Sequence, residues 1–381
     1  MKICHVITRM IIGGAQENTL LTCAGLRDRG HEVTLLAGPE TGPEGSLWPE
    51  VERLGIEHVV VDPMVRAVRP LRDWACWRRL EKLFSERAFD VVHTHSSKAG
   101  ILGRATARRA GVPRIVHTIH GMSFNRTQTW PVRWLYRSLE RRVGDWTDAF
   151  ITVADAMTAQ AVAAGLGPPE KFTTIYSGMR TELFGPNAES RARVRWDWGI
   201  DDQAVVVGTI ARLFRGKGYE QIIQAMPQMC RQEPRLQFVW VGDGRDRKRY
   251  LADVTRLGLR DRVHLTGLVL PEVIPRLLAG FDILLHASQW EGLPRALPQA
   301  LLTEVPVVSF DNDGAPEVVE SGRTGELVPF GDHAALGRRV VNLAQDATGR
   351  RIMGAEGRRR CLDAFGHRRM VDRIEALYRA L

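Results

Sequence analysis

Two cations stand close together in a glycine-containing segment of the second half of the chain. Residues 211–218 read ARLFRGKG and follow an apolar run that ends at Ile210. Arginine offers a planar fork of hydrogen-bond donors, and lysine offers a point charge. A glycine-containing loop adds backbone N–H groups, and together these groups suit a diphosphate. Arg212 and Lys217 are therefore candidate diphosphate ligands, although a solvated basic loop would show the same bare pattern.

Two hydrogen-bond acceptors follow another apolar run. Residues 288–300 read SQWEGLPRALPQA, and Gln299 comes eight residues after Glu291, on an expected helix. Eight residues are slightly more than two helical turns, so both side chains can face one pocket. A carboxylate is a strong acceptor for vicinal hydroxyls. Two aligned acceptors of this kind suit the hydroxyl-bearing rings of a nucleotide sugar.

Glycines follow two further expected strands. Gly13 and Gly14 open a helix, where unpaired N–H groups favour an anion, although Gly-Gly can equally be only a tight turn. The pair lacks the G-x-G-x-x-G spacing of a nicotinamide site. Gly242 and the neighbouring Asp243 let backbone approach a ligand closely, although Asp243 could instead cap a helix.

Short β-branched runs alternate with helical patterns almost throughout the chain, which predicts parallel sheets covered on both faces. The pattern restarts near residue 204, after the polar stretch 185–190. We therefore expect two doubly wound α/β domains that face each other across a cleft. Ligands of such sheets bind beyond the carboxyl ends of the strands, where all the residues above are expected.

The expected strands and helices are defined by these runs. The strands are 2–8, 32–37, 58–62, 90–94, 114–118, 149–154, 204–210, 236–241, 263–265, 282–287 and 306–309. The helices include 15–29, 219–231, 247–257, 272–279, 295–304 and the amphipathic final segment 367–381.

Histidines near two strand ends raise the question of a metal. His93 and His95 alternate on one expected strand and can share a face, and His117 and His120 end the next. Zinc needs a third or fourth convergent ligand, and no cysteine or H-E-x-x-H helix supplies one. We expect no metal. The five scattered cysteines indicate buried thiols rather than a disulfide framework.

Together these motifs make the chain resemble the retaining GT-B glycosyltransferases of family 4 (glycosyl transferases group 1), which include capsular and cell-surface polysaccharide enzymes. The resemblance covers nearly the whole chain and rests on Gly13-Gly14, residues 90–95 (DVVHTH), residues 117–121 (HTIHG), Arg212 with Lys217-Gly218, Glu291-Gly292-Leu293 and the final helix. It implies two Rossmann-like domains, with the final helix returning to the first.

The resemblance also implies roles for individual residues. Arg212 and Lys217 would hold the donor diphosphate, and Glu291 would contact hydroxyls of the donor sugar. Gln299 takes the ribose-binding position, where the family has a second glutamate; its carbonyl still accepts a hydroxyl but brings no charge. His120 would hydrogen-bond the donor sugar near the reaction centre. The enzymes of this family are metal-independent, and their first domain binds the acceptor.

One further departure lies in the interdomain turn, where the family pattern is Asn-Gly-hydrophobic-Asp. The chain has Ser177-Gly178-Met179-Arg180 there. Serine can replace the turn-forming asparagine, but the acid is lost at Arg180.

Charge is concentrated in residues 66–142, which hold 17 Lys/Arg and 5 Asp/Glu, a net charge of +12 in a chain whose total is +9. Two aromatic helical stretches within this segment favour an anionic membrane interface or a lipid-linked acceptor. The alternative is an ordinary helix with its tryptophans in the core. No nucleic-acid motif accompanies the charge. The residues of this predicted patch are Arg72, Trp74, Trp77, Arg78, Trp130, Arg133, Trp134 and Arg137.

We therefore expect a transferase that moves a sugar from a nucleotide-diphosphate sugar to a glycan or lipid-linked acceptor. Residues 1–183 with 367–381 are expected to bind the acceptor and residues 184–366 the donor. An apolar signal core and a membrane span are both missing from the sequence, so we expect a cytoplasmic protein, peripheral on the inner membrane face. The alternatives are an epimerase or phosphorylase of the same fold, or a non-catalytic membrane-associated binding protein.

Overall fold

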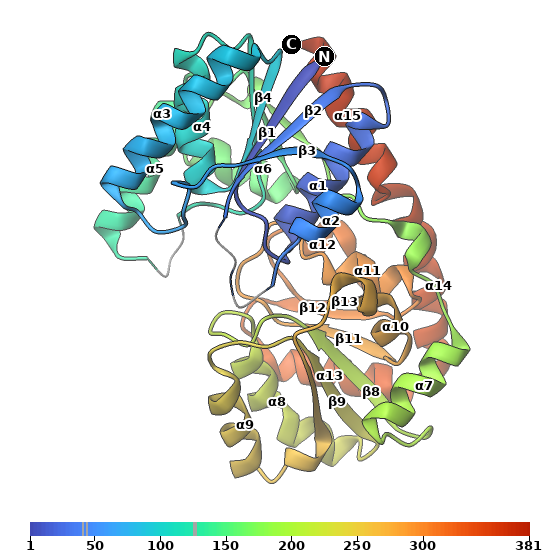
Figure 1. Ribbon diagram of the computed structural model, residues 1–381. Helices are drawn as coiled ribbons and strands as arrows, with labels where there is room; N and C mark the ends of the chain where they lie inside the picture. The colour runs from blue at the N-terminus through green and yellow to red at the C-terminus, as the bar shows by residue number, and fades with distance from the viewer. Residues whose placement is uncertain (40–41, 43–44, 125–127) are drawn as a thin grey trace. The chain divides into compact units, whose positions relative to one another are not determined.

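A computed structural model describes residues 1–39, 42, 45–124 and 128–381. The chain forms two compact units (Figure 1). Unit 1 comprises residues 1–179 and 367–381, and unit 2 comprises residues 180–366. The sequence analysis placed this division at residues 183 and 184.

Within the described residues, unit 1 contains a seven-stranded parallel sheet with the order β3-β2-β1-β4-β5-β6-β7. Its strands are β1 (Lys2–Arg9), β2 (Glu32–Gly38), β3 (Glu57–Val60), β4 (Val91–His95), β5 (Arg114–Ile119), β6 (Ala149–Thr152) and β7 (Phe172–Thr174). Its helices are α1 (Gly14–Arg27), α2 (Trp48–Arg53), α3 (Pro70–Arg87), α4 (Ser97–Arg109), α5 (Trp130–Gly144), α6 (Asp155–Ala163) and α15 (His367–Ala380).

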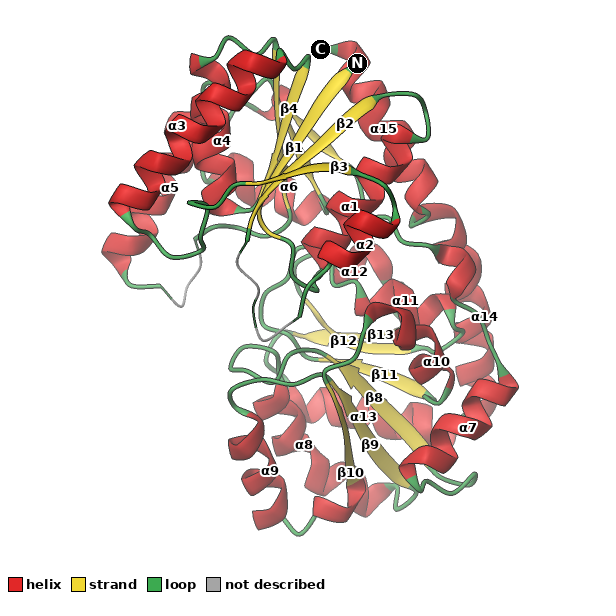
Figure 2. Cartoon of the chain, in the orientation of Figure 1, coloured by secondary structure: helices red, strands yellow, loops and turns green. Residues whose placement is uncertain are grey.

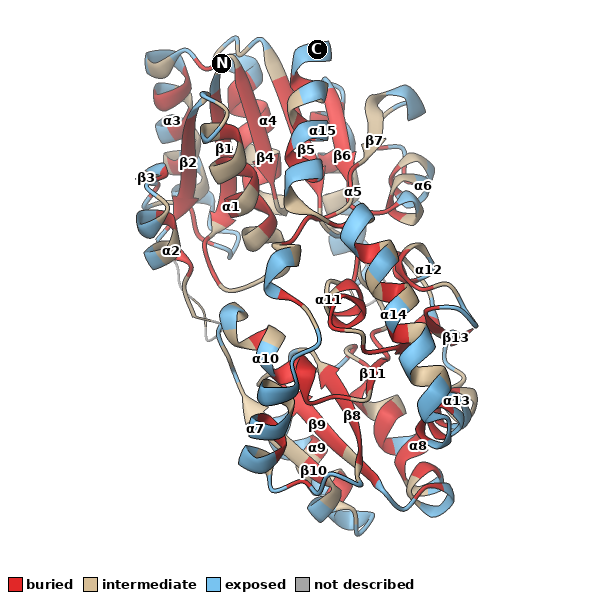
Figure 3. Cartoon of the chain, turned by 90° about the vertical axis from the view of Figure 1, so that its right-hand side faces the viewer, coloured by how far each residue is buried: buried red, intermediate tan, exposed pale blue. Residues whose placement is uncertain are grey.

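Strand alternation divides the core of unit 1 into two layers. Ile3 and Ile7 of β1 pack with α1, α2 and α15, whereas Cys4 and Val6 pack with α3 and α4. Figure 3 shows the strands buried beneath these helices. Because both faces are covered, the strands read as nearly continuous apolar runs, which is why they were predictable.

The predicted return of the final helix to the first domain is confirmed. Helix α15 buries Met370, Val371, Ile374 and Tyr378, and each such side chain contributes roughly 1.5–3 kcal/mol on leaving water. Asn18 Nδ2 of α1 donates a hydrogen bond of 3.0 Å to the sulfur of Met370.

Unit 2 contains, among its residues, a six-stranded parallel sheet with the order β10-β9-β8-β11-β12-β13. Its strands are β8 (Val205–Ile210), β9 (Leu236–Val241), β10 (Val263–Gly267), β11 (Ile283–His286), β12 (Val307–Asp311) and β13 (Gly325–Pro329). Its helices are α7 (Ala188–Trp198), α8 (Tyr219–Gln232), α9 (Arg247–Arg256), α10 (Ile274–Ala279), α11 (Ala296–Leu302), α12 (Ala315–Val318), α13 (His333–Gln345) and α14 (Ala347–Ala364).

Helices flank both faces of this sheet (Figure 2). Helix α8 contacts α9 and α13 in one layer, and α10 contacts α7 and α11 in the other. The expectation of two doubly wound parallel-sheet domains is therefore confirmed. Strands β7 and β13 were not predicted; they are short edge strands, and β13 ends in proline. The expected cleft between the domains stays a prediction.

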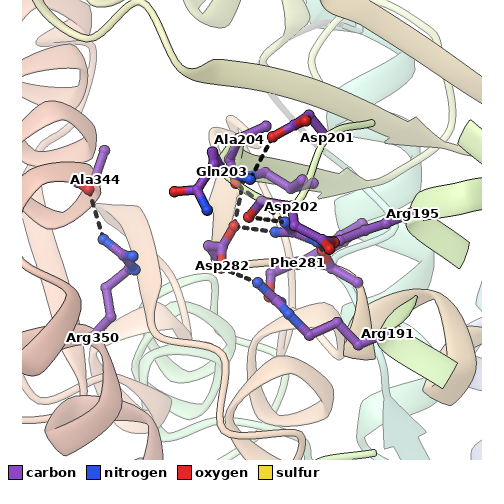
Figure 4. A network of polar contacts seen from close by, with 12 residues as sticks. Arg191, Arg195, Asp201, Asp202, Gln203, Ala204, Phe281, Asp282, Ala344 and Arg350 are labelled. Carbon is purple, nitrogen blue, oxygen red and sulfur yellow. Dashed lines mark hydrogen bonds and ion pairs between the residues drawn. The ribbon is translucent and has the colours of Figure 1, made fainter. Parts of the chain in front are cut away.

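A largely buried acid, Asp282, ties α7 to the sheet of unit 2 (Figure 4). Asp282 accepts hydrogen bonds from Arg191 at 2.7 Å, Arg195 at 2.5 Å and the backbone N–H of Val206 at 2.7 Å. The Arg195 side chain is almost fully buried, so its charge requires this partner. The network fixes α7 at the end of the sheet opposite to the loops described next.

Candidate active site

Three loops meet at the carboxyl edge of the sheet in unit 2, because parallel strands all end on the same side. They follow β8 (residues 211–218), β9 (residues 242–246) and β11 (residues 287–295). Hydrogen bonds join them: the Gln289 N–H donates to Gly216 O at 2.9 Å, and the Leu213 N–H donates to Asp243 O at 3.0 Å. The predicted donor-binding loops are therefore neighbours in space.

Lys217 and Glu291 form an ion pair in which Nζ lies 2.5 Å from Oε1. The two side chains are only 15% and 24% exposed, so water screens their attraction weakly. Burial raises the pKa of Glu291. The positive charge of Lys217, the neighbouring His286 ring and hydrogen bonds from Lys217 and Ser288 outweigh burial and hold this pKa below its ordinary value. Glu291 is thus an ionised acceptor at the sheet edge.

His286, the last residue of β11, lies close to this pair, with Nε2 4.0 Å from Glu291 Oε1. Burial lowers the pKa of His286 to about 4, against the opposing attraction of Glu291, so the imidazole is neutral at pH 7. Its Nε2 is buried and has no hydrogen-bond partner among the described residues. The Glu291 carboxylate, the Lys217 ammonium and the neutral His286 ring therefore lie close together.

Arg212 shares a neighbour with Lys217. The Arg212 guanidinium carbon lies 4.9 Å and the Lys217 ammonium 5.9 Å from the centre of the Phe214 ring. Arg212 is exposed, whereas Lys217 is half-buried. Both predicted cations thus flank one aromatic ring beside Glu291.

Two glycines allow the loops to come this close. A Cβ on Gly218, which has φ +85°, would lie 2.1 Å from the carbonyl oxygen of Ala287. A Cβ on Gly242, with φ +132°, would lie 2.4 Å from the carbonyl oxygen of Ala211. Only glycine fits at either position, because both the backbone conformation and the space exclude a side chain.

Asp243, Gly292 and Leu293, which were also predicted to bind the donor, occupy the same loops. Asp243 accepts from the Gly244 N–H at 2.7 Å and from Arg247 at 3.1 Å. It is not the N-cap of α9, a position that Asp246 holds, so the capping alternative was wrong.

Gly292 and Leu293 are buried beside Glu291, and Gln299 is half-buried on α11. The Gly314 N–H donates to Gly292 O at 3.2 Å, which joins this segment to the loop that follows β12.

His120 lies in unit 1, where it lines a pocket of about 260 Å³. Ala15 of α1, directly after Gly13 and Gly14, and Ser96 at the start of α4 line the same pocket. Ser96 has φ +61° and ψ 162°, a conformation rare outside glycine, and such strain gathers at functional sites. The pocket therefore joins His120 to the predicted glycine turn.

The histidine cluster is larger than the sequence indicated. Among the described residues, His5, His93 and His95 form a buried group whose ring nitrogens lie within 4.8 Å of one another. His5 is thus a third convergent imidazole, and the argument that no such ligand exists was wrong. Both nitrogens of His93 are, however, hydrogen-bonded to hydroxyls, at 2.5 Å to Tyr378 and 2.7 Å to Thr118.

The predicted patch on α3 and α5 exposes its aromatic rings. Trp74, Trp130 and Trp134 are 66%, 69% and 59% exposed, so the alternative with tryptophans in the core was wrong for them. Trp77 is half-buried, while Arg72, Arg78 and Arg133 are exposed. Arg137 instead donates to Ala164 O at 3.0 Å, at the end of α6. Both helices pack against α4.

Sequence reasoning missed three residues of these sites: His5, His286 and Asp313. Asp313 Oδ2 accepts the Glu291 N–H at 2.7 Å from an unusual backbone conformation, φ +47°. His5 and His286 lie inside apolar strands, where a polar residue is unusual and could have indicated a functional position. No sequence feature pointed to Asp313.

Among the described residues, none of the helices has the length and apolar character to cross a bilayer.

Comparison with known proteins agrees with this architecture. The family model of glycosyl transferases group 1 matches residues 190–360, and that of glycosyltransferase family 4 matches residues 12–183. An Escherichia coli UDP-Gal:α-D-GlcNAc-diphosphoundecaprenol α-1,3-galactosyltransferase is 28% identical over 99% of this chain and 96% of its own. A GDP-mannose-dependent α-(1-6)-phosphatidylinositol monomannoside mannosyltransferase of Mycolicibacterium smegmatis is 29% identical over 78% of each chain.

The fold matches that of a solved protein with the same organisation. The crystal structure of Anabaena Alr3699/HepE in complex with UDP and glucose superposes with a TM-score of 0.87, at 23% identity and over all of both chains. Two matched family models, one on each unit, and a shared fold over the full length lead to one conclusion. The chain belongs to the GT-B glycosyltransferases of family 4.

Proposed function

We propose that this protein is a retaining hexosyltransferase of cell-surface polysaccharide synthesis, which moves a sugar from a nucleotide-diphosphate sugar to a glycan or lipid-linked acceptor. The observation that carries the proposal is the half-buried Lys217–Glu291 pair among three glycine-containing loops. Its support from relatives is that both curated proteins above are named as α-transferases that use nucleotide sugars.

In this proposal unit 2 holds the donor. Arg212 forms a bidentate contact with the diphosphate, and Lys217 turns its ammonium from Glu291 to a phosphate oxygen. Glu291 then accepts hydrogen bonds from hydroxyls of the sugar, and Gln299 accepts one from the ribose. Backbone at Gly242, Gly292 and Leu293 and the Asp243 carboxylate complete the donor site, and no metal is required because two cations face the diphosphate.

The reaction proceeds by attack on the same face from which the diphosphate leaves. The bond from the anomeric carbon to the diphosphate oxygen breaks, the acceptor oxygen bonds to that carbon, and the acceptor proton passes to the departing phosphate. Arg212, Lys217 and the amides that follow Gly13 and Gly14 stabilise the negative charge of the leaving group. His120 hydrogen-bonds the donor sugar near the reacting carbon.

The acceptor binds to unit 1, and the patch on α3 and α5 holds the protein on the anionic inner face of the membrane. Each basic residue near such a surface contributes about 1 kcal/mol, and tryptophan prefers the interface. This placement brings a lipid-linked acceptor to the protein, although the patch is independent of the chemistry in unit 2.

The test is a transfer assay with UDP-, GDP- and ADP-sugars, chosen first by which of them raises the melting temperature. Retention predicts an α-linked product from an α-linked donor, read by proton NMR, and turnover that EDTA does not change. Arg212→Ala and Lys217→Ala each lower turnover strongly, whereas Arg215→Ala, an exposed cation of the same loop, does not. Gln299→Glu keeps or raises turnover.

Three outcomes would contradict the proposal. Isomerised sugar from donor alone would indicate an epimerase, and phosphate-dependent shortening of a glycan would indicate a phosphorylase. Donor binding with no transfer to a broad panel of acceptors would indicate a non-catalytic binding protein.

A further inference from the structure

Three histidines of unit 1 form a continuous row of hydrogen bonds: His5 lies in β1, His95 ends β4, and His120 directly follows β5. His5 Nδ1 lies 2.9 Å from His95 Nε2, and His95 Nδ1 lies 3.1 Å from His120 Nε2. Strand β1 pairs with β4, where His5 is opposite His93, and β4 pairs with β5, where His95 is opposite Thr118. Side chains two residues apart share a face, so this register brings the three rings into line.

The rings within the core are neutral. Burial lowers the pKa of His5 to about 3. Burial, followed by the neighbouring rings of His93 and His5, holds the pKa of His95 well below its usual value. Each neutral imidazole has one N–H and one bare nitrogen, so every link in the chain needs a donor on one side and an acceptor on the other.

These two links couple the tautomers of the three rings. If Nδ1 of His5 carries its proton, it donates to Nε2 of His95, whose proton must then be on Nδ1. That proton is donated to Nε2 of His120, so His120 also carries its own proton on Nδ1. In the opposite arrangement all three protons are on Nε2, and no mixed state keeps both hydrogen bonds.

The environment of His5, at the end of the histidine row away from His120, selects one of these two tautomer arrangements. Nε2 of His5 is buried and has no hydrogen-bond partner among the described residues. A buried N–H without an acceptor is rarer in proteins than a buried acceptor without a donor. The bare nitrogen of His5 is therefore Nε2, which places all three protons on Nδ1.

We propose that His5 and His95 are positioning residues that fix His120 in its Nδ1–H tautomer, so that any group bonded to Nδ1 of His120 must be an acceptor. This rests on the proposed function, in which His120 contacts the donor sugar. A hydroxyl oxygen of the sugar, or an oxygen of its phosphate, satisfies this requirement. His120 lines a pocket of unit 1, and in this tautomer its Nδ1–H is a hydrogen-bond donor.

The chain also offers a matched pair of substitutions. An asparagine amide occupies the place of histidine Nδ1 and a glutamine amide that of Nε2. His95→Asn therefore keeps a partner for His120 and loses His5, whereas His95→Gln keeps His5 and loses the link to His120. Because the asparagine amide can donate or accept, residue 95 then no longer selects one tautomer of His120.

The experiment is ¹⁵N NMR of the histidine rings in the full-length protein, with His120 assigned from the spectrum of His120→Asn. We expect His120 to be entirely Nδ1–H in the wild type and a mixture in His95→Asn. His264→Asn, a substitution in unit 2, leaves the His120 signal unchanged. If only the Nδ1–H fraction f binds the donor, the Kd for that donor rises by 1/f in His95→Asn.

Three results would overturn the inference. They are an Nε2–H tautomer of His120 in the wild type, an unchanged donor Kd when the tautomers mix, and stoichiometric zinc on His5 and His95 in the purified protein. The tautomer is read without any sugar present, so its failure leaves the transfer assay untouched. A protein with Nδ1–H on His120 that transfers no sugar contradicts the proposed function alone.

Discussion

Gly218 is the position where a single methyl group most directly tests the geometry of the candidate donor loops. Its φ of +85° costs an alanine roughly 1–2 kcal/mol. The added Cβ would lie 2.1 Å from the Ala287 carbonyl oxygen, whereas real Cβ contacts are essentially never below 3.0 Å, so loop and strand end must separate. Such overpacking costs a further 1–3 kcal/mol or so, and we expect Gly218→Ala to lower the free energy of unfolding by about 2–5 kcal/mol.

The same displacement has a functional consequence, because Lys217 precedes Gly218 in the chain. Separation by nearly 1 Å lengthens the 2.5 Å contact between Lys217 and Glu291. We expect the Kd for the stabilising nucleotide sugar to rise at least about ten-fold, equivalent to 1.4 kcal/mol. Denaturant unfolding measures the loss of stability, and hydrogen exchange in α8 shows whether it is local to this loop. Calorimetric titration with the nucleotide sugar measures the Kd.

Gly258→Ala is the matched control in the same unit. Gly258 has φ +69°, but no atom lies within 4 Å of its added Cβ, so only the backbone cost of about 1–2 kcal/mol applies. Donor affinity stays at the wild-type value in this variant. If Gly218→Ala matched Gly258→Ala in both stability and affinity, the close approach of the two loops would be refuted.

Other residues give independent tests of the account. Glu291 has a lowered pKa, so its stabilisation is present above the unfolded pKa near 4.5 and is lost as the pH falls through the folded pKa. The stability difference between wild type and Glu291→Gln should therefore shrink as the pH falls below 4.5, and parallel curves would contradict this. Trp134→Ser should lower binding to vesicles containing phosphatidylglycerol about ten-fold. Trp196→Ser, a substitution of a side chain in unit 2 that is 72% exposed, should leave this binding unchanged. Equal effects of the two substitutions would refute a role of the patch in membrane binding. Arg104→Met leaves the carboxylate of Glu140 buried without its ion-pair partner and should lower the free energy of unfolding by about 3–5 kcal/mol. Adding Glu140→Leu should restore most of this stability in the double variant. Additive losses of stability would show that the two residues are not coupled.

The fold was predictable because the sheets of both units are covered on two faces. Each central strand is then a run of apolar residues, as in Leu236–Val241, where prediction and structure agree at both ends. The edge strands β7 and β13 were not predicted, since half-buried residues leave only a weak apolar pattern.

The candidate donor site was partly predictable for a different reason. Arg212, Lys217 and Glu291 each follow an apolar strand, and parallel strands bring their ends to one edge. His5 reaches the histidine cluster because β1 pairs with β4, and a local sequence pattern does not predict which strands are neighbours. Asp313 accepts a hydrogen bond from the Glu291 N–H and lies in the loop after β12. This contact could not be predicted without knowing the conformation of that loop.

The most direct test of the central claim is the Kd of the nucleotide sugar for Lys217→Met, measured beside Arg215→Met. Removing a charge-assisted hydrogen bond costs about 1.5–3 kcal/mol, which predicts roughly a ten- to hundred-fold weaker Kd for Lys217→Met. Arg215→Met, an exposed cation two residues earlier, should bind as the wild type does. Wild-type affinity in Lys217→Met would contradict the assignment of this loop to the diphosphate.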